Sequence, residues 1–315
     1  MKYNDSSTIK SVSIILGYYN GNKYLKEQIQ SILRQSHQNF DIFISDDHSS
    51  VAPDMNILGL TTEEAKKVHI TTQANNLGFC KNFLITLAKV DKPSDYFAFS
   101  DQDDLWHPDK IENALKLLSQ HPEDKPAVYC SRTNISDETG HTVLGMSPLF
   151  KKTPSFSNAL VQSIAGGNTM VFNRAARDII VRSTTNTQVV SHDWWCYQII
   201  TGTGGVVLYD TNPSLNYRQH QENLVGSNDS WFARLTRVRY LWEGKLRTWN
   251  DINLTALVKN RDQLTLDNQH LLDLFITMRQ SSLCKRLYLM KRARLYRQTI
   301  LGNIGLLVAI FFNKV

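Results

Sequence analysis

This sequence of 315 residues is short of paired cysteines and of long apolar runs. Its four cysteines stand apart, without a Cys-x-x-Cys pair, which argues against a zinc site and favours a reducing, cytosolic compartment. The polar start, MKYNDSSTIK, lacks the apolar centre of a signal peptide, and the apolar stretch IGLLVAIFF near the end is too short to span a bilayer. The otherwise ordinary composition excludes the collagen-like and disordered classes.

Acidic residues are scarce only in the C-terminal part of the chain, from residue 231 onward. Residues 231–315 hold 15 Lys and Arg against 5 Asp and Glu, with no acid after Asp273, whereas the whole chain carries a net charge of only +6. A local surplus of this size indicates a change of role near residue 230. We therefore expect one large domain over residues 1–229 and a basic helical segment over residues 230–315.

Strand and helix patterns alternate through the first 220 residues. Near-continuous apolar runs predict buried strands at 12–19, 40–47, 68–73, 95–101 and 127–132. Apolar residues at helical spacing predict helices between these strands, and Pro108 opens one of them. This alternation predicts an α/β fold in which helices sandwich a sheet.

Two acidic clusters stand where predicted strands end, which is where open α/β sheets bind ligands. Ser45–Asp47 closes the second strand, and Asp101, Asp103 and Asp104 follow the fourth within SDQDD. A single Asp at such a place often caps the next helix, but crowded carboxylates raise each other's pKa or share a cation. Oxygen ligands select a hard divalent ion, Mg²⁺ or Mn²⁺, held jointly with substrate phosphates.

Three later segments add polar residues to this pattern. A Gly-Gly loop at residues 166–167 leads into a strand and a helix, and Ser191 is the expected N-cap of a helix that carries Asp193. The strand VVLYD is followed by NYRQHQENLVG, which we expect to be a loop.

Seven segments, in this order, resemble family 2 glycosyltransferases of the GT-A fold: VSIILGYYNG, ISDDHSS, NLGF, FSDQDDLWHPDK, GGNTMVF, HDWW and YRQHQENLVG. The resemblance spans residues 11–226 and is greatest to the branch of bacterial rhamnosyltransferases and related polysaccharide enzymes. Each segment alone is weakly specific, but the order of all seven is highly specific. The chain departs from the family pattern at residues 17–20, where Ala-Thr-Tyr-Asn is frequent, and at His48, where glycine is usual.

The resemblance implies roles for individual residues. It implies a catalytic base at Asp193 and a site for Mg²⁺ or Mn²⁺ at Asp101, Asp103 and His220. The residues expected to contact the donor nucleotide are Gly17, Tyr19, Asn20, Asp46, Lys81, Asp101, Gln102 and Arg218. Those expected to contact the sugar or the acceptor are Asp104, Gly166, Gly167, Asn168, His192 and Trp194.

Structural roles are the alternatives for several of these residues. Asp193 can cap the helix after Ser191, and Tyr19 can lie at the edge of the core. Trp194, like its neighbour Trp195, can lie in the core rather than against a sugar ring. His220 can be an ordinary surface residue of a loop.

The activity implied by the resemblance is inverting, metal-dependent transfer of a sugar from dTDP-rhamnose or a UDP-hexose to a saccharide or lipid-linked acceptor. The transfer requires a base because an acceptor hydroxyl is a poor nucleophile. Negative charge develops on the departing diphosphate, and a divalent ion stabilises that charge. Relatives of this kind build surface polysaccharide at the inner face of the bacterial membrane, so we expect that location here.

The basic C-terminal segment has three possible roles. Arg and Leu recur at helical spacing, and the apolar end fits a segment lying on an anionic membrane surface. A helical unit packed on the large domain and a contact between copies of the chain are the alternatives. No nucleic-acid motif accompanies the charge, so we expect no nucleic-acid partner.

Two other protein classes share part of the pattern. Phosphotransferases of the haloacid dehalogenase type also carry Asp-x-Asp at a strand end, but on an early strand and followed by Thr or Val. Here Asp104 and Leu105 follow the motif near residue 100. A catalytically weak scaffold is the non-enzymatic alternative, and the presence of Asp101, Asp193 and His220 argues against it.

Overall fold

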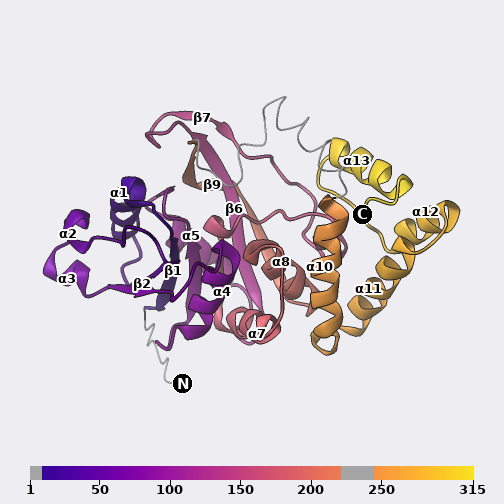
Figure 1. Ribbon diagram of the computed structural model, residues 1–315, viewed down its shortest axis with the longest axis horizontal. Coiled ribbons are helices and arrows are strands. Elements are labelled where there is room, and N and C mark those ends of the chain that lie inside the picture. Colours follow the sequence, from indigo (N-terminus) through magenta and orange to yellow (C-terminus); the bar gives the residue numbers. More distant parts are fainter. Residues whose placement is uncertain (1–8, 221–244) are drawn as a thin grey trace, which may run out of the picture.

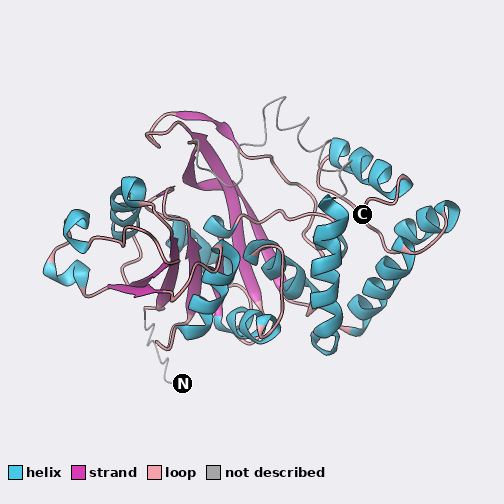
Figure 2. Cartoon of the chain, in the orientation of Figure 1, coloured by secondary structure: helices cyan, strands magenta, loops and turns pink. Residues whose placement is uncertain are grey.

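The computed structural model describes residues 9–220 and 245–315 (Figure 1). The strands are β1 Val12–Tyr18, β2 Phe40–Asp46, β3 Val68–Thr72, β4 Tyr96–Ser100, β5 Leu105–Trp106, β6 Ala127–Ser136, β7 Val143–Met146, β8 Val171–Asn173 and β9 Val206–Arg218. They form a mixed nine-stranded sheet in the order β3-β2-β1-β4-β8-β6-β9-β5, with β7 paired to β6. Helices cover the sheet, which confirms the predicted α/β class (Figure 2).

The helices form two groups, one around the sheet and one at the C-terminal end of the chain. The first set is α1 Asn22–Leu33, α2 Met55–Leu58, α3 Thr62–Ala65, α4 Phe79–Lys89, α5 Lys110–Leu118, α6 Phe156–Ala159, α7 Arg174–Thr184 and α8 His192–Gly202. The C-terminal set is α10 Lys245–Lys259, α11 Leu266–Arg279, α12 Leu283–Arg292 and α13 Ile300–Phe311. Two 3₁₀ turns, η1 Gly167–Thr169 and η2 Arg261–Gln263, complete the elements.

The N-terminal half of the sheet is parallel. β1 lies between β2 and β4, and the pairing sets Tyr18 beside Asp46 and Leu16 beside Ser100. These strands read as continuous apolar runs because both of their faces are covered. Leu25 of α1 belongs to the hydrophobic core on one face, and Phe83 of α4 belongs to the core on the other. The carboxyl ends of the three strands therefore meet at one fixed edge.

The second half of the sheet is mixed, and it corrects one expectation. β8 runs antiparallel to both β4 and β6, whereas β6 and β9 run parallel. The sequence predicts a loop from Asn216 onward, but Asn216 to Arg218 pair with Asn134 to Ser136 and extend β9. β9 therefore ends at Arg218, and His220, two residues later, lies at the edge of the sheet where β4 ends.

The C-terminal helices pack on the α6–α8 side of the sheet. Leu257 of α10 and Phe275 of α11 are fully buried in the same hydrophobic cluster as Trp195 of α8. Asn268 Nδ2 donates to Gly202 O at 2.9 Å, which ties α11 to the end of α8. The helices thus form a packed unit, which was one of their three expected roles. The expected boundary at residues 229 and 230 lies outside the described residues, as does the basic stretch 231–242.

Candidate active site

The acidic tip, defined as Asp101, Asp103 and Asp104, follows β4 at the edge where β1 and β2 also end. Asp104 is fully buried, accepts a hydrogen bond from Asn168 Nδ2 at 2.6 Å, and leaves its Oδ1 without a partner. Burial, followed by the charges of the other two carboxylates, raises the pKa of Asp104 well above its usual value. Burial, then the charges of Asp103 and Asp193, raises the pKa of Asp101 to about 7. Burial and mutual repulsion therefore disfavour the charged forms of Asp101 and Asp104 at the acidic tip.

His220 joins the acidic tip from a point 117 positions further along the chain. Its Nε2 lies 2.8 Å from Asp103 Oδ2, and its ring packs on Tyr24 with the ring centres 4.7 Å apart. The imidazole is nearly buried, and its Nδ1 has no hydrogen-bond partner. The structure thus brings together Asp103 and His220, two of the three residues expected to bind a metal.

The residues present fit a divalent ion that is held jointly with phosphate oxygens. Across residues 9–220 and 245–315, no three His, Cys, Asp or Glu side chains converge closely enough to hold an ion by themselves. Mg²⁺ sites of nucleotide enzymes commonly use one or two carboxylates and take the other ligands from substrate and water. Asp101 and Asp103 are two carboxylates that can supply such oxygen ligands. The neighbouring Asp104 has an Oδ1 atom without a hydrogen-bond partner.

Gln102 connects the acidic tip to the loop after β1. Its Oε1 accepts from Tyr19 N at 2.8 Å, and its Nε2 donates to Tyr19 O at 3.2 Å. A Cβ on Gly21 would lie 2.1 Å from this amide, so a larger residue there would displace Gln102 from these bonds. Tyr19 is half exposed, and Asn20 binds the backbone N–H of Ser50 through its side chain. The Tyr19 ring therefore stands free for a ligand, while Gln102 and Asn20 hold the loop.

Asp46 is buried at the end of β2 with one oxygen unused. Its Oδ1 accepts from Ser49 N at 2.9 Å, and its Oδ2 has no partner. His48 has a φ of +61°, the left-handed conformation that favours glycine, which explains why glycine is usual at this place in the family. The turn therefore leaves a carboxylate oxygen available at the strand end.

Three residues expected to touch the donor or sugar pack closely against other side chains of the protein. A Cβ on Gly17 would lie 2.8 Å from the ring of Phe83, and a Cβ on Gly167 would lie 2.3 Å from His192 Nε2. His192 is buried against Phe83, with ring centres 4.3 Å apart, and burial lowers its pKa. Gly166 is exposed beside Asn168, whereas Gly167 is buried, and close backbone approach to a sugar at this loop stays a prediction.

Asp193 lies in the first turn of α8, partly exposed, with its neighbours buried. Ser191 begins the helix as predicted but makes no capping bond; Asp193 Oδ1 accepts the Trp194 N–H at 2.7 Å instead. The charge of Asp193 contributes to the raised pKa of Asp101, so the two carboxylates share one site. The Trp194 ring is buried and its Nε1 donates to Ala159 O at 2.8 Å, and its contact with a sugar stays a prediction.

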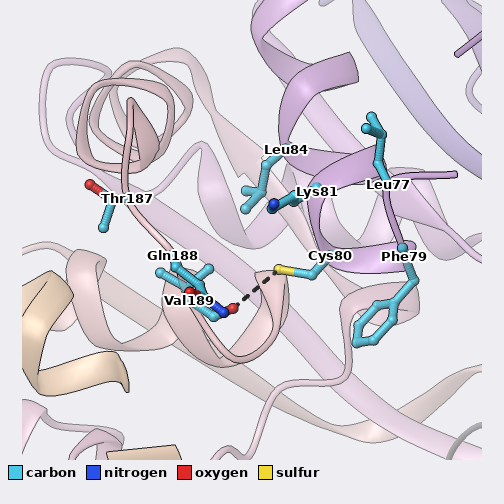
Figure 3. Close-up of a pocket in the computed structure, with 9 residues that line it drawn as sticks. Leu77, Phe79, Cys80, Lys81, Leu84, Thr187, Gln188 and Val189 are labelled. Atoms are coloured by element: carbon cyan, nitrogen blue, oxygen red, sulfur yellow. Dashed lines mark hydrogen bonds between the residues drawn. The ribbon is translucent and has the colours of Figure 1, made fainter. Parts of the chain in front are cut away.

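Arg218 and Lys81 are the basic residues expected to contact the donor nucleotide. The Arg218 guanidinium lies 5.1 Å from the centre of the Tyr24 ring, which also packs on His220. The buried Arg218 guanidinium forms an ion pair with Glu27 and donates to Thr139 O at 2.8 Å. Residues of the protein therefore bind the guanidinium group that was expected to contact the diphosphate. Lys81 is exposed on α4 and borders a cavity of about 170 Å³ between α4 and residues 187–189 (Figure 3). The Cys80 thiol faces this cavity from α4, and burial raises its pKa to about 12.

Lys110 is a site residue that the sequence reasoning missed. It is fully buried, its Nζ donates to Asn168 O, and it lies 3.5 Å from the centre of the Trp106 ring. Burial lowers its pKa well below the usual value, while Asp104 and Asp101 oppose that change. Lys110 shares the buried face of α5 with Ala114 and Leu118, at a spacing of four residues. A lysine on an apolar helix face was the signal that could have identified it.

Comparisons with known proteins agree with this geometry. The family model "Glycosyl transferase family 2" matches residues 13–180. The chain is 30% identical over 243 residues to the dTDP-rhamnosyl transferase RfbG of Shigella flexneri, which covers 72% of this chain and 80% of that protein. It is 24% identical over 247 residues to the putative teichuronic acid biosynthesis glycosyltransferase TuaG of Bacillus subtilis, covering 76% and 85%.

A solved structure shares the fold. The structure of S. aureus TarS 1-349 in complex with UDP-GlcNAc superposes with a TM-score of 0.52 and 15% identity, over 96% of this chain and 90% of that one. The family match covers more than half of this chain, and the Shigella relative is similar over most of its length. The chain therefore belongs to glycosyl transferase family 2, and it is a glycosyltransferase with a GT-A-like fold.

Proposed function

We propose that the protein transfers a sugar, with inversion, from a nucleotide-diphosphate donor to a saccharide or lipid-linked acceptor during synthesis of a bacterial surface polysaccharide. The observation that supports the proposal is the crowding of Asp101 and Asp103 after β4, with His220 Nε2 at 2.8 Å from Asp103 and with the charge of Asp193 raising the pKa of Asp101. The names of the Shigella and Bacillus relatives support a polysaccharide product. The expected place of action is the inner face of the membrane.

The donor nucleotide would occupy the ends of β1 and β2. The unpartnered Oδ2 of Asp46 can accept a hydrogen bond from a base N–H, and the exposed ring of Tyr19 can pack against the base. Gln102, which bonds both backbone groups of Tyr19, would hold that ring in place as the donor binds. The diphosphate would then extend toward the acidic tip.

Asp101, Asp103 and His220 would hold Mg²⁺ or Mn²⁺ together with the donor phosphates. When bound, such an ion stabilises the negative charge that develops on the departing diphosphate. In the structure, His220 Nε2 lies 2.8 Å from Asp103 Oδ2. To bind the ion, His220 would give up this contact with Asp103. Asp104 would remain buried and, through Asn168, would hold η1 beside the sugar.

Asp193 would act as the general base. One of its oxygens is oriented by the Trp194 N–H, so the other can accept the proton of an acceptor hydroxyl. The hydroxyl oxygen would then form a bond to the anomeric carbon as the bond to the diphosphate breaks on the opposite side. Attack from that side inverts the anomeric configuration.

The donor is tested with a panel of dTDP-rhamnose, UDP-glucose, UDP-galactose and UDP-N-acetylglucosamine, each incubated with the purified protein and Mn²⁺. Because one relative is a dTDP-rhamnosyl transferase, we expect release of dTDP from dTDP-rhamnose above the other donors, and loss of that release with EDTA. Nucleotide release that EDTA leaves unchanged would contradict the metal-dependent mechanism. No release from any donor, with or without a saccharide acceptor, would favour a scaffold.

A further inference from the structure

The outer face of α13 is an exposed apolar surface without a charged residue. The helix sequence, ILGNIGLLVAIF, is uncharged, and Leu306, Ala309 and Ile310 are buried on its inner side. The outer side and the residue after the helix expose large apolar side chains by 39% to 82%. These side chains, here called the α13 face, are Ile300, Leu301, Ile304, Leu307, Val308, Phe311 and Phe312. A contiguous apolar patch of this kind marks an interaction surface.

The residues around the α13 face are basic. No Asp or Glu follows Asp273 in the sequence. Lys291, Arg292 and Arg294 are exposed in the segment that leads into α13, and Lys285 is exposed on α12. α12 and α13 lie together at the end of the molecule opposite α2 and α3 (Figure 1). The patch thus joins an apolar face to positive charge.

The length of α13 determines how it can meet a bilayer. Twelve residues rise about 18 Å, which is well below the roughly 30 Å of a hydrocarbon core. In the part of the chain that the structure describes, no helix has the length and apolar character needed to cross a membrane. An apolar helix face beside basic residues is instead suited to lie in the plane of the interface, with its apolar side chains among the acyl chains.

We infer that the α13 face docks on an anionic lipid surface. A second copy of the chain is the less suitable occupant, because a two-fold contact through this face would set basic residues against basic residues. Anionic head groups supply the complementary charge, and acyl chains cover the apolar side chains. The inference does not depend on the proposed donor or acceptor, since docking requires neither.

Vesicle binding by the full chain tests the apolar part of the surface. We expect the protein to sediment with vesicles of phosphatidylcholine and phosphatidylglycerol, and at least tenfold more weakly with phosphatidylcholine alone. The double substitution Leu307→Glu with Phe311→Glu should weaken binding at least tenfold. Leu266→Glu is the matched control, because Leu266 is 82% exposed on α11 outside the α13 face, and it should bind like wild type. Unchanged thermal unfolding would show that the variants fold.

Charge reversal tests the electrostatic part. Lys291→Glu with Arg292→Glu should weaken binding to the anionic vesicles about tenfold or more and leave the weak binding to neutral vesicles unchanged. Lys116→Glu, on the exposed side of α5, is the control and should have no effect. Binding of wild type should also fall as salt rises from about 0.1 M to 1 M.

Two results would overturn the inference. One is wild-type protein that fails to sediment with phosphatidylglycerol vesicles, or that binds neutral vesicles equally well. The other is a stable dimer in analytical ultracentrifugation that Leu307→Glu with Phe311→Glu converts to monomer without any vesicle binding by wild type. That outcome would assign the α13 face to a protein contact. Neither assay contains a nucleotide-sugar donor, so neither result tests the proposed transfer reaction.

Discussion

The acidic tip and the α13 face depart from ordinary protein surfaces in opposite ways. At the acidic tip, the fully buried Asp104 and the half-buried Asp101 and Asp103 crowd together, and burial and mutual repulsion raise the pKa of Asp101 and Asp104. At the α13 face, large apolar side chains are exposed where water would normally meet polar groups. Buried uncompensated charge and exposed apolar surface are each costly for the isolated chain. We propose a different ligand for each site, a divalent ion at the acidic tip and a lipid surface at the α13 face.

The comparison shows why the two regions are expected to respond differently to substitution. The acidic tip is supported by fixed contacts, such as the bond from Asn168 to Asp104, so a change there should alter chemistry. The side chains of the α13 face are 39% to 82% exposed, so a change there should alter binding to a surface and leave chemistry intact. The predictions below test this division, starting with the largest expected effect.

Asp103→Ala should abolish sugar transfer with every donor, a loss on the order of 10³-fold or more, because it removes one of the carboxylates expected to hold the ion. Steady-state turnover with Mn²⁺ measures the loss. Asp124→Ala, an exposed acid elsewhere on the surface, should retain wild-type turnover. Substantial turnover by Asp103→Ala would remove the acidic tip from the reaction.

Asp193→Asn should lower transfer by about 10²–10⁴-fold while donor binding stays near normal. The asparagine keeps an oxygen for the Trp194 N–H, so it preserves the helix start and removes only the base. Calorimetry of donor binding and measurement of kcat separate the two effects. Loss of donor binding, or an unchanged kcat, would contradict the role as base.

Lys110→Met should lower kcat more than it raises KM, because Lys110 positions η1 through its bond to Asn168 O. We also expect a loss of stability of about 1–3 kcal/mol, since a buried acceptor loses its donor. Lys110→Arg keeps the charge but is larger, and should recover part of the stability. Equal kinetics in wild type and Lys110→Met would show that the lysine serves the fold alone.

Asp101→Asn should stabilise the metal-free protein in a pH-dependent way. The native carboxyl has a pKa of about 7, whereas an unfolded Asp titrates near 4, so the native state loses stability as pH rises from about 4 through 7. The variant removes that loss, by up to about 4 kcal/mol above pH 7 and by about 1.4 kcal/mol at pH 5. Denaturant unfolding at pH 5 and pH 8 in EDTA measures it. An equal change in the free energy of unfolding at pH 5 and pH 8 would contradict a raised pKa for Asp101 in the native state.

Leu307→Glu should change donor hydrolysis and unfolding free energy very little, within about 0.5 kcal/mol, because the side chain is 45% exposed. Chemical denaturation in the absence of vesicles measures the stability. A large destabilisation would mean that the α13 face is covered within the chain, and the contrast between the two regions would fail.

The sequence predicted the sheet and the position of the acidic tip because both follow from local patterns. Apolar runs such as β4 are buried on both faces, and Asp101 stands directly after that run. The burial of Trp194 and the close packing of Gly167 did not follow from local patterns, because they depend on contacts between distant segments, such as Gly167 against His192. The extension of β9 depends on its pairing with β6, and no local pattern in NYR shows that.

The most direct measurement is a crystal structure of the protein with Mn²⁺ and dTDP, using anomalous diffraction to locate the metal. We predict an anomalous peak bound by Asp101 and Asp103, with His220 and the diphosphate oxygens completing the site. A diphosphate bound elsewhere, or a well-ordered nucleotide with no manganese beside these residues, would contradict it.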